Sequence, residues 1–303
     1  MVQIARQTPT RVEVAEPLPI CYLNGEYLPF EAARVSPFDR GFLFGDGVYE
    51  VMPVYAGRPF RLAAHTARLT RSLAAIRMED PHTKDEWRGI IASLLEKNGS
   101  QDQSLYWQVT RGAERGRNHA PLPKLPRTVF MFSTPLALPT AEVRERGVAC
   151  ITTLDTRWAR CDIKSTALLA NILLRELSVE ANAAETIMLR DGQLTEGSSS
   201  AVHVVIEAEL RSPEQSPQIL AGTTRSVVEE LAARAGIAHR AMPITAAQLR
   251  TADEIWISSA LREILPVTFL DGAPVGAGRP GPIWRRLYNE LQHYKRELSG
   301  QPW

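Results

Sequence analysis

The sequence contains few cysteines and few lysines. Its three cysteines, Cys21, Cys150 and Cys161, are odd in number and widely spaced, which argues against both a disulfide framework and a metal cluster. A reducing cytoplasm is therefore the expected location. Only 5 of the 35 basic residues are lysine, and the net charge of +1 gives no electrostatic reason to expect binding to nucleic acid or to an anionic membrane.

Long hydrophobic runs are also missing. No segment approaches the roughly 20 apolar residues of a membrane span. Residues 1–19 contain scattered charges and prolines and no apolar segment of the kind found in secretory signals, so we expect a flexible or loosely docked arm. The 303 residues, 44% hydrophobic and 23% charged, are typical of a globular protein and suffice for two modest domains or one large one.

Strand and helix patterns alternate through both halves of the chain. Asn24-Gly25 predicts a hairpin turn, and prolines at 135 and 139 predict a linker after which the pattern restarts. Periodicity predicts helices over 65–78, 86–98, 166–182 and 224–235, and strands over 20–23, 27–30, 47–55, 105–111, 127–133, 148–153, 186–190, 201–206 and 254–258. We therefore predict a mixed α/β (α+β) protein: an arm (1–19), a small domain (20–134), a linker (135–141) and a large domain (142–303).

Lys164 differs from the other lysines. Four of them (Lys84, Lys97, Lys124 and Lys295) have charged or polar residues or proline as neighbours, which is typical of a surface, whereas Lys164 leads into the apolar stretch 166–174, which we expect to be a core element. A partly desolvated amine is a usable nucleophile. Glu196 follows 32 residues later in a turn rich in hydroxyl groups. Pyridoxal phosphate chemistry needs both groups, an amine to hold the aldehyde and an acid to keep the pyridine nitrogen protonated.

Three other patterns fit the same chemistry but have simpler explanations when each is taken alone. Thr223 and Thr224 precede a helix whose first N–H groups could bind phosphate, or they could serve only as an N-cap. Ser258-Ser259 ends a strand and could be a simple turn. Arg68 follows His65 on a helix, where a surface arginine is the alternative.

The stretches around these residues occur in the same order as in a known family. Over residues 20–270 the chain resembles the fold type IV pyridoxal-phosphate aminotransferases, the group that includes D-amino acid and branched-chain aminotransferases and aminodeoxychorismate lyase. The resemblance implies a two-domain fold with helices in each domain. The matching stretches are 39–50 (DRGFLFGDGVYE), 65–69 (HTARL), 162–165 (DIKS), 195–200 (TEGSSS), 222–225 (GTTR), 258–259 (SS) and 263–267 (EILPV).

The resemblance implies a role for each matched residue. Lys164 would form a Schiff base with pyridoxal 5'-phosphate and carry out the 1,3-proton shift, and Glu196 would pair with the pyridine nitrogen. Arg157 would be a structural charge near the site. The other cofactor-binding residues would be Arg68, Thr223, Thr224 and Ser259 at the phosphate and Leu220 against the ring, and the substrate-binding residues would be Tyr49, Arg117, His119 and Ser199.

The loop Arg117-Asn118-His119, together with Tyr49, resembles the carboxylate-binding site of D-amino acid aminotransferases. There the Arg and the His come from the neighbouring subunit of a homodimer. Arginine suits a carboxylate because its planar fork donates two parallel hydrogen bonds, although a basic surface loop is the simpler alternative.

We therefore expect a cytoplasmic, homodimeric enzyme without a metal, acting on small molecules. It would transfer an amino group between a D-amino acid and a 2-oxo acid, with D-alanine and 2-oxoglutarate the pair suggested by analogy. The alternatives are a branched-chain L-amino acid or (R)-amine transaminase of the same fold, aminodeoxychorismate lyase, and a domain that keeps the fold for binding only.

Overall fold

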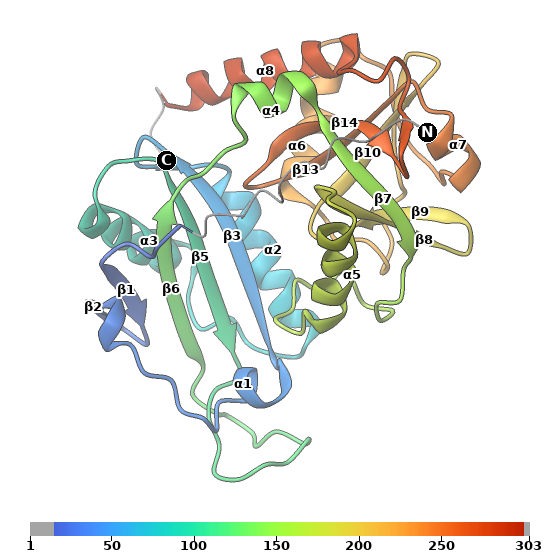
Figure 1. The fold of residues 1–303 in the computed structure, drawn as a ribbon. Coiled ribbons are helices and arrows are strands. Elements are labelled where there is room, and N and C mark those ends of the chain that lie inside the picture. Colours follow the sequence, from blue (N-terminus) through green and yellow to red (C-terminus); the bar gives the residue numbers. More distant parts are fainter. Residues whose placement is uncertain (1–14, 300–303) are drawn as a thin grey trace.

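Two β-sheets form the framework of the protein in the computed structural model, which describes residues 15–299 (Figure 1). The first sheet has six strands in the order β2-β1-β6-β5-β3-β4, and all of its neighbours are antiparallel. Most of the predicted arm, residues 1–14, lies outside the described residues. The strands are β1 (Ile20–Leu23), β2 (Glu26–Pro29), β3 (Gly47–Tyr55), β4 (Arg58–Pro59), β5 (Gln103–Thr110) and β6 (Thr128–Pro135).

The second sheet mixes parallel and antiparallel neighbours. Its order is β12-β11-β10-β13-β14-β7-β8-β9, with β15 beside β14, and the parallel pairs are β11–β12, β14–β7 and β7–β8. The predicted mixed α/β class is confirmed, although only this sheet is itself mixed. The strands are β7 (Val148–Leu154), β8 (Glu185–Arg190), β9 (Gln193–Gly197), β10 (Ala201–Ile206), β11 (Glu209–Ser212), β12 (His239–Ala241), β13 (Glu254–Ser259), β14 (Glu263–Leu270) and β15 (Ala273–Pro274).

Helices cover both sheets. Local signals define some of their ends: Thr83 and Glu86 form a capping box at the start of α3, and Gly99 ends it. No helix within residues 15–299 is long and apolar enough to cross a membrane. The helices are α1 (Arg40–Phe44), α2 (Leu62–Ala75), α3 (Lys84–Asn98), α4 (Ala141–Arg146), α5 (Leu169–Glu180), α6 (Thr223–Arg234), α7 (Ala246–Arg250) and α8 (Pro282–Ser299), with a 3₁₀ turn at Phe30–Ala32.

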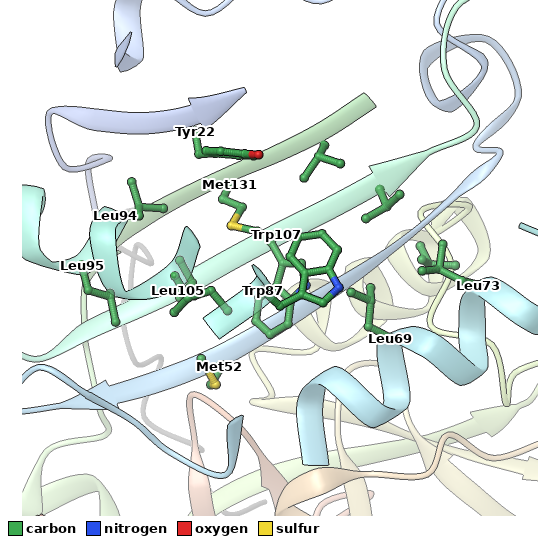
Figure 2. Packing of buried hydrophobic residues seen from close by; sticks show 14 of the residues in the cluster. Tyr22, Met52, Leu69, Leu73, Trp87, Leu94, Leu95, Leu105, Trp107 and Met131 are labelled. Carbon is green, nitrogen blue, oxygen red and sulfur yellow. The ribbon is translucent and has the colours of Figure 1, made fainter. Parts of the chain in front are cut away.

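The first core lies between the six-stranded sheet and helices α2 and α3 (Figure 2). Leu69 of α2 and Trp87 of α3 are fully buried against Trp107 and Met131 of the sheet. Burying one such side chain contributes about 1.5–3 kcal/mol. Ile163, the residue before Lys164, belongs to the same cluster. The core therefore fixes the backbone next to the predicted catalytic lysine.

The second sheet is covered on one face by α6 and α8. Leu231 of α6 packs in one cluster with Leu287 and Leu291 of α8 and with Trp256 of β13. Helix α8 was not predicted from the sequence, although Trp284, Leu287 and Leu291 repeat at helical spacing.

Helix α5 differs from its prediction in two ways. It begins at Leu169 rather than at 166, because Thr166 is held by β3: its backbone N–H donates to the carbonyl of Gly47 at 3.0 Å. The helix was also expected to be a core element, but Leu169 is 70% exposed and Leu173 is 55% exposed. The apolar pattern therefore marks a surface of this chain.

The stretch predicted to be a linker, residues 135–141, includes the connection from β6 of the first sheet to α4, which precedes β7 of the second sheet. Strand β6 continues to Pro135, and α4 begins at Ala141, where the hydroxyl of Thr140 caps the helix by accepting from the N–H of Val143 at 3.3 Å. The domain boundaries at 134 and 142 stay a prediction.

Candidate active site

A cavity of about 570 Å³ lies where the loop before α5, the turn after β9 and the start of α6 come together. Nine of the predicted site residues line it: Tyr49, Arg68, Lys164, Glu196, Ser199, Leu220, Thr223, Thr224 and Ser259. Segments far apart in the sequence therefore meet around Lys164, although the role of each residue remains a prediction.

Lys164 is held in place through its backbone. Its carbonyl accepts a hydrogen bond from the N–H of Tyr49 at 2.9 Å, and its own N–H donates to the hydroxyl of Ser72 at 3.3 Å. Its Nζ lies 4.2 Å from the centre of the Tyr49 ring, a cation–π contact. The amine is thus presented to the cavity from a rigid support, against an aromatic face.

Glu196 is a buried carboxylate on the cavity wall. Arg157 Nη1 donates to its Oε1 at 2.5 Å, and the N–H of Leu220 donates to Oε2 at 3.1 Å. Burial raises the pKa of Glu196, and the guanidinium of Arg157 opposes that rise. A carboxylate made more basic by burial is a strong acceptor for a protonated ring nitrogen.

The resemblance implies only that Arg157 is a structural charge near the site, but in the structure Arg157 contacts the site residue Glu196 directly. Besides Glu196, its guanidinium binds Asp155 through Nε at 2.9 Å and Nη2 at 2.8 Å. Burial alone would lower the pKa of Arg157, but the two carboxylates raise it. A permanently charged guanidinium therefore fixes the orientation of Glu196.

The first turn of α6 faces the cavity with its N–H groups uncapped. The N-cap residue, Gly222, has no side chain to cap the helix, and the first helical residues are Thr223 and Thr224. In residues 15–299 no acceptor is found for the N–H groups of these two threonines. Such a helix start is a ready site for a phosphate group.

Arg68 lines the cavity, and its guanidinium is hydrogen-bonded to groups of the protein. Its Nε and Nη2 donate to Glu50 at 2.7 and 2.6 Å, and its Nη1 donates to the carbonyl of Ala221 at 3.0 Å. His65 Nδ1 lies 2.8 Å from the same carboxylate of Glu50. Burial alone would raise the pKa of Glu50, but Arg68 and His65 lower it to about 2. Glu50 was not recognised from the sequence, where it is a single acid within an apolar strand.

Ser199 is oriented by a second buried acid that was not predicted. Its hydroxyl donates to Glu185 Oε2 at 2.8 Å, and those of Ser198 and Ser200 donate to the same carboxylate. Arg262 adds an ion pair with Glu185 at 2.6 Å. Burial alone would raise the pKa of Glu185, but Arg262 and the serine hydroxyls lower it. No local pattern reveals Glu185, because Arg262 is 77 residues away in the sequence.

The loop with Arg117 and His119 is separate from this cavity. Neither residue lines it in the described part of the chain, and both side chains are exposed. The ring of Phe44 contacts both of them, at 5.0 Å from Arg117 Cζ and 5.5 Å from the His119 ring. His119 lines a second cavity of about 410 Å³, which shares Trp158, Ser165 and Ala167 with the first.

Residues 47–270 match the family model described as amino-transferase class IV. The D-alanine aminotransferase of Bacillus licheniformis is 38% identical over 270 residues, which are 89% of this chain and 95% of that protein. The D-alanine aminotransferase of Staphylococcus epidermidis is also 38% identical, over 92% of this chain and 98% of its own length. This chain belongs to the class IV aminotransferases, and the predicted fold type is confirmed.

Solved structures agree with that assignment. The branched-chain amino acid aminotransferase of Escherichia coli superimposes with a TM-score of 0.87 at 25% identity, over 91% of this chain and 94% of its own. The T.th. branched-chain amino acid aminotransferase, solved with pyridoxamine 5'-phosphate, gives a TM-score of 0.85 at 26% identity, over 91% and 93%. The resemblance thus extends over nearly all of both chains.

Proposed function

We propose that this aminotransferase uses pyridoxal 5'-phosphate to transfer an amino group between a D-amino acid, with D-alanine the first candidate, and a 2-oxo acid such as 2-oxoglutarate. The observation that carries the proposal is the meeting of Lys164, Glu196 and the uncapped start of α6 in one cavity. Similarity to the D-alanine aminotransferases over about nine-tenths of the chain supports the choice of substrate.

The residues around the cavity fit this cofactor by their chemistry. The uncapped N–H groups of Thr223 and Thr224, with Arg68 beside them, would hold the phosphate, and Ser259 would add a hydroxyl. Glu196 would accept a hydrogen bond from the ring nitrogen, and Leu220 would pack against the ring. When bound, the cofactor supplies a covalent hold on the substrate amine and an electron sink for the electrons of the α-carbon.

The protein's own contribution is to place and move a proton. With cofactor and substrate bound, the free Nζ of Lys164 would act as the base that removes the proton from the substrate α-carbon and as the acid that delivers it two atoms away, which completes the 1,3-proton shift. General acid–base catalysis of this kind contributes about 10²–10⁴-fold. Fixing the lysine backbone between β3 and α2 keeps Nζ in reach during both transfers.

We also propose a homodimer in which the neighbouring subunit supplies Arg117 and His119 to bind the substrate carboxylate. Arg117 lies outside the Lys164 cavity of its own chain. The exposed apolar residues Phe42 of α1 and Leu169 and Leu173 of α5 would suit packing against a second copy. Leu173→Glu is expected to shift the protein from dimer to monomer in sedimentation. A dimer unchanged by this charge would contradict the placing of α5 at the interface.

The experiment is an activity assay with matched lysine variants. Protein loaded with pyridoxal phosphate should be yellow and should form pyruvate from D-alanine and 2-oxoglutarate. Lys164→Ala should lose both the colour and the activity, whereas Lys124→Ala, at an exposed lysine, should keep them. A Lys164→Ala protein with an unchanged spectrum would contradict the role of this lysine.

A branched-chain L-amino acid transaminase is the second candidate, because the branched-chain enzymes superimpose closely on this chain. Consumption of 2-oxoglutarate with L-leucine in place of D-alanine separates the two. Pyruvate released from aminodeoxychorismate without a 2-oxo acid would indicate the lyase instead. A cytoplasmic location remains a proposal from the cysteine content.

A further inference from the structure

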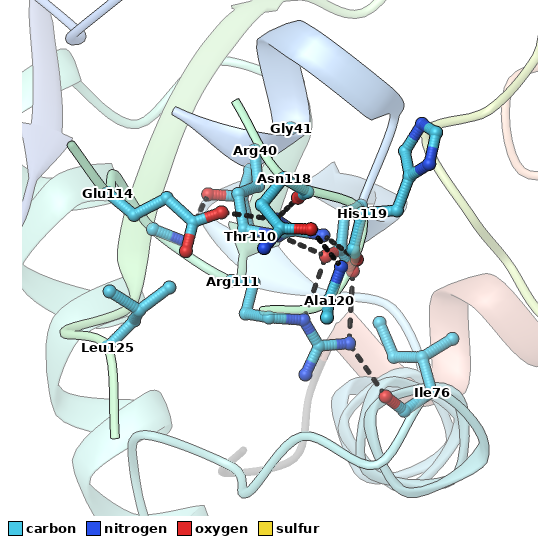
Figure 3. A network of polar contacts seen from close by, with 12 residues as sticks. Arg40, Gly41, Ile76, Thr110, Arg111, Glu114, Asn118, His119, Ala120 and Leu125 are labelled. Atoms are coloured by element: carbon cyan, nitrogen blue, oxygen red, sulfur yellow. Dashed lines mark hydrogen bonds and ion pairs between the residues drawn. The ribbon is translucent and has the colours of Figure 1, made fainter. Parts of the chain in front are cut away.

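The loop of residues 112–122 carries Arg117 and His119. The backbone of this loop is held by a single buried guanidinium, that of Arg40 (Figure 3). Arg40 begins α1 and is 3% exposed. Its Nη1 donates to the carbonyl of Asn118 at 2.6 Å, and its Nη2 donates to the carbonyl of His119 at 2.9 Å. Its backbone N–H donates to the carbonyl of Gly112 at 2.9 Å. One residue therefore holds both the base and the far side of the loop.

Two carboxylates compensate the buried charge. Arg40 Nε donates to Asp46 Oδ2 at 2.8 Å, and Nη1 also pairs with Glu114, which lies in the loop itself. The other oxygen of Glu114 accepts from the N–H of Leu122 at 3.2 Å, so the acid ties the returning side of the loop to the same cluster. With three nitrogens in use, the guanidinium fixes the loop in a geometry that an ammonium could not reproduce.

Helix α1 also orients the loop's side chains. Phe44 lies one turn after Arg40, and its ring is 4.7 Å from Arg40 Cζ and 5.0 Å from Arg117 Cζ. The His119 ring meets the same Phe44 ring edge to face at 5.5 Å. The backbone bonds of Arg40 and the ring of Phe44 thus act on the two residues proposed to bind substrate.

We propose that Arg40, with Glu114, is a positioning residue that holds the 112–122 loop so that Arg117 and His119 meet the carboxylate of the substrate. This inference rests on the proposed function, because the role of the loop in binding the substrate carboxylate comes from that proposal. The new part is the support of the loop by Arg40 and Glu114. A loop held by two backbone carbonyls loses its position, and not its chemistry, when that support changes. Loss of this support should therefore weaken the binding of substrate and leave the rate of the chemical step unchanged.

The test is Arg40→Lys in the cofactor-loaded enzyme. The KM for D-alanine should rise by about 10- to 100-fold, as expected for misplaced binding groups, while kcat and the affinity for pyridoxal phosphate stay near their original values. Hydrogen–deuterium exchange should rise within residues 112–122. Glu114→Gln, which keeps the shape of the side chain, should give the same pattern to a smaller degree and serves if Arg40→Lys fails to fold.

Arg111→Lys is the matched control. Arg111 binds the same Asp46, at 2.8 and 3.0 Å, but its other contacts are to the end of α2, at the carbonyls of Ile76 and Arg77. It should leave the KM unchanged. In an Arg117→Ala background, Arg40→Lys should raise the KM by a smaller factor than it does alone, because one of the two groups that it positions is gone.

Two results would overturn the inference, and they are distinguishable. If Arg117→Ala raises the KM but Arg40→Lys and Glu114→Gln do not, the positioning role is wrong and the proposed function stands. If Arg117→Ala leaves the KM for D-alanine unchanged, the loop does not bind substrate, and both the loop's proposed role and this inference fail.

Discussion

Glu50→Gln should destabilise the protein because it removes the charge that compensates Arg68. The carboxylate is completely buried and receives hydrogen bonds from Arg68 at 2.7 and 2.6 Å and from His65 at 2.8 Å. Lowering the pKa of Glu50 from its ordinary 4.5 to about 2 is equivalent to about 3 kcal/mol. Breaking a buried ion pair by neutralising one partner typically costs about 3–5 kcal/mol. We therefore expect the free energy of unfolding to fall by about 3 kcal/mol at pH 7.

The assay is urea unfolding of the cofactor-free protein at a fixed protein concentration. Glu297→Gln is the control, since its ion pair with His293 is exposed and should be worth no more than about 1 kcal/mol. Inorganic phosphate should restore part of the stability of Glu50→Gln, because Arg68 then lacks its anion and lies next to the proposed phosphate site. A Glu50→Gln protein as stable as its Glu297→Gln counterpart would refute the reasoning.

Three other substitutions follow from the site and the core. Burial lowers the pKa of His203 to about 3, so between pH 6.5 and 3 the unfolded chain binds a proton that the folded chain does not. Stability should thus fall with falling pH, and His203→Gln should remove about 1.4 kcal/mol per pH unit from the slope of unfolding free energy; an unchanged slope would contradict the burial argument. Glu196→Gln should lower kcat by about 10²–10³ while the cofactor stays bound, since it removes the charged partner of the ring nitrogen; full activity would exclude that role. Arg117→Ala should raise the KM for D-alanine about 10- to 100-fold, the value of a charge-assisted pair, in steady-state kinetics, whereas Arg115→Ala in the same loop should not.

Local patterns predicted those parts of the fold whose causes are local. Asn24 and Gly25 both have positive φ, +51° and +101°, and form the predicted turn between β1 and β2. Helices α2, α3 and α6 lie within a few residues of their predicted ranges. The order of the motifs also predicted which segments surround Lys164, because the family resemblance carries the tertiary arrangement with it.

Features that depend on distant partners could not be predicted in this way. Glu50 joins the site through Arg68, and Glu185 joins it through Arg262 and the three serines of the turn after β9. No local spacing connects either acid to these partners. The apolar stripe of α5 was interpreted as core, because periodicity does not say whether the covering surface comes from the same chain. In the sequence, Arg40 is distinguished only as part of the matched stretch 39–50, and its contacts to Asn118 and His119 span 78 and 79 residues.

The central claim is tested most directly by single-turnover reactions of the cofactor-loaded protein with the two enantiomers of alanine and with L-leucine, followed by the visible absorbance of the bound cofactor. The account predicts that D-alanine bleaches this absorbance and that 2-oxoglutarate restores it, while L-alanine and L-leucine leave it unchanged. Bleaching by L-leucine with no response to D-alanine would contradict the proposed substrate, and no response to any amino acid would contradict transamination at Lys164.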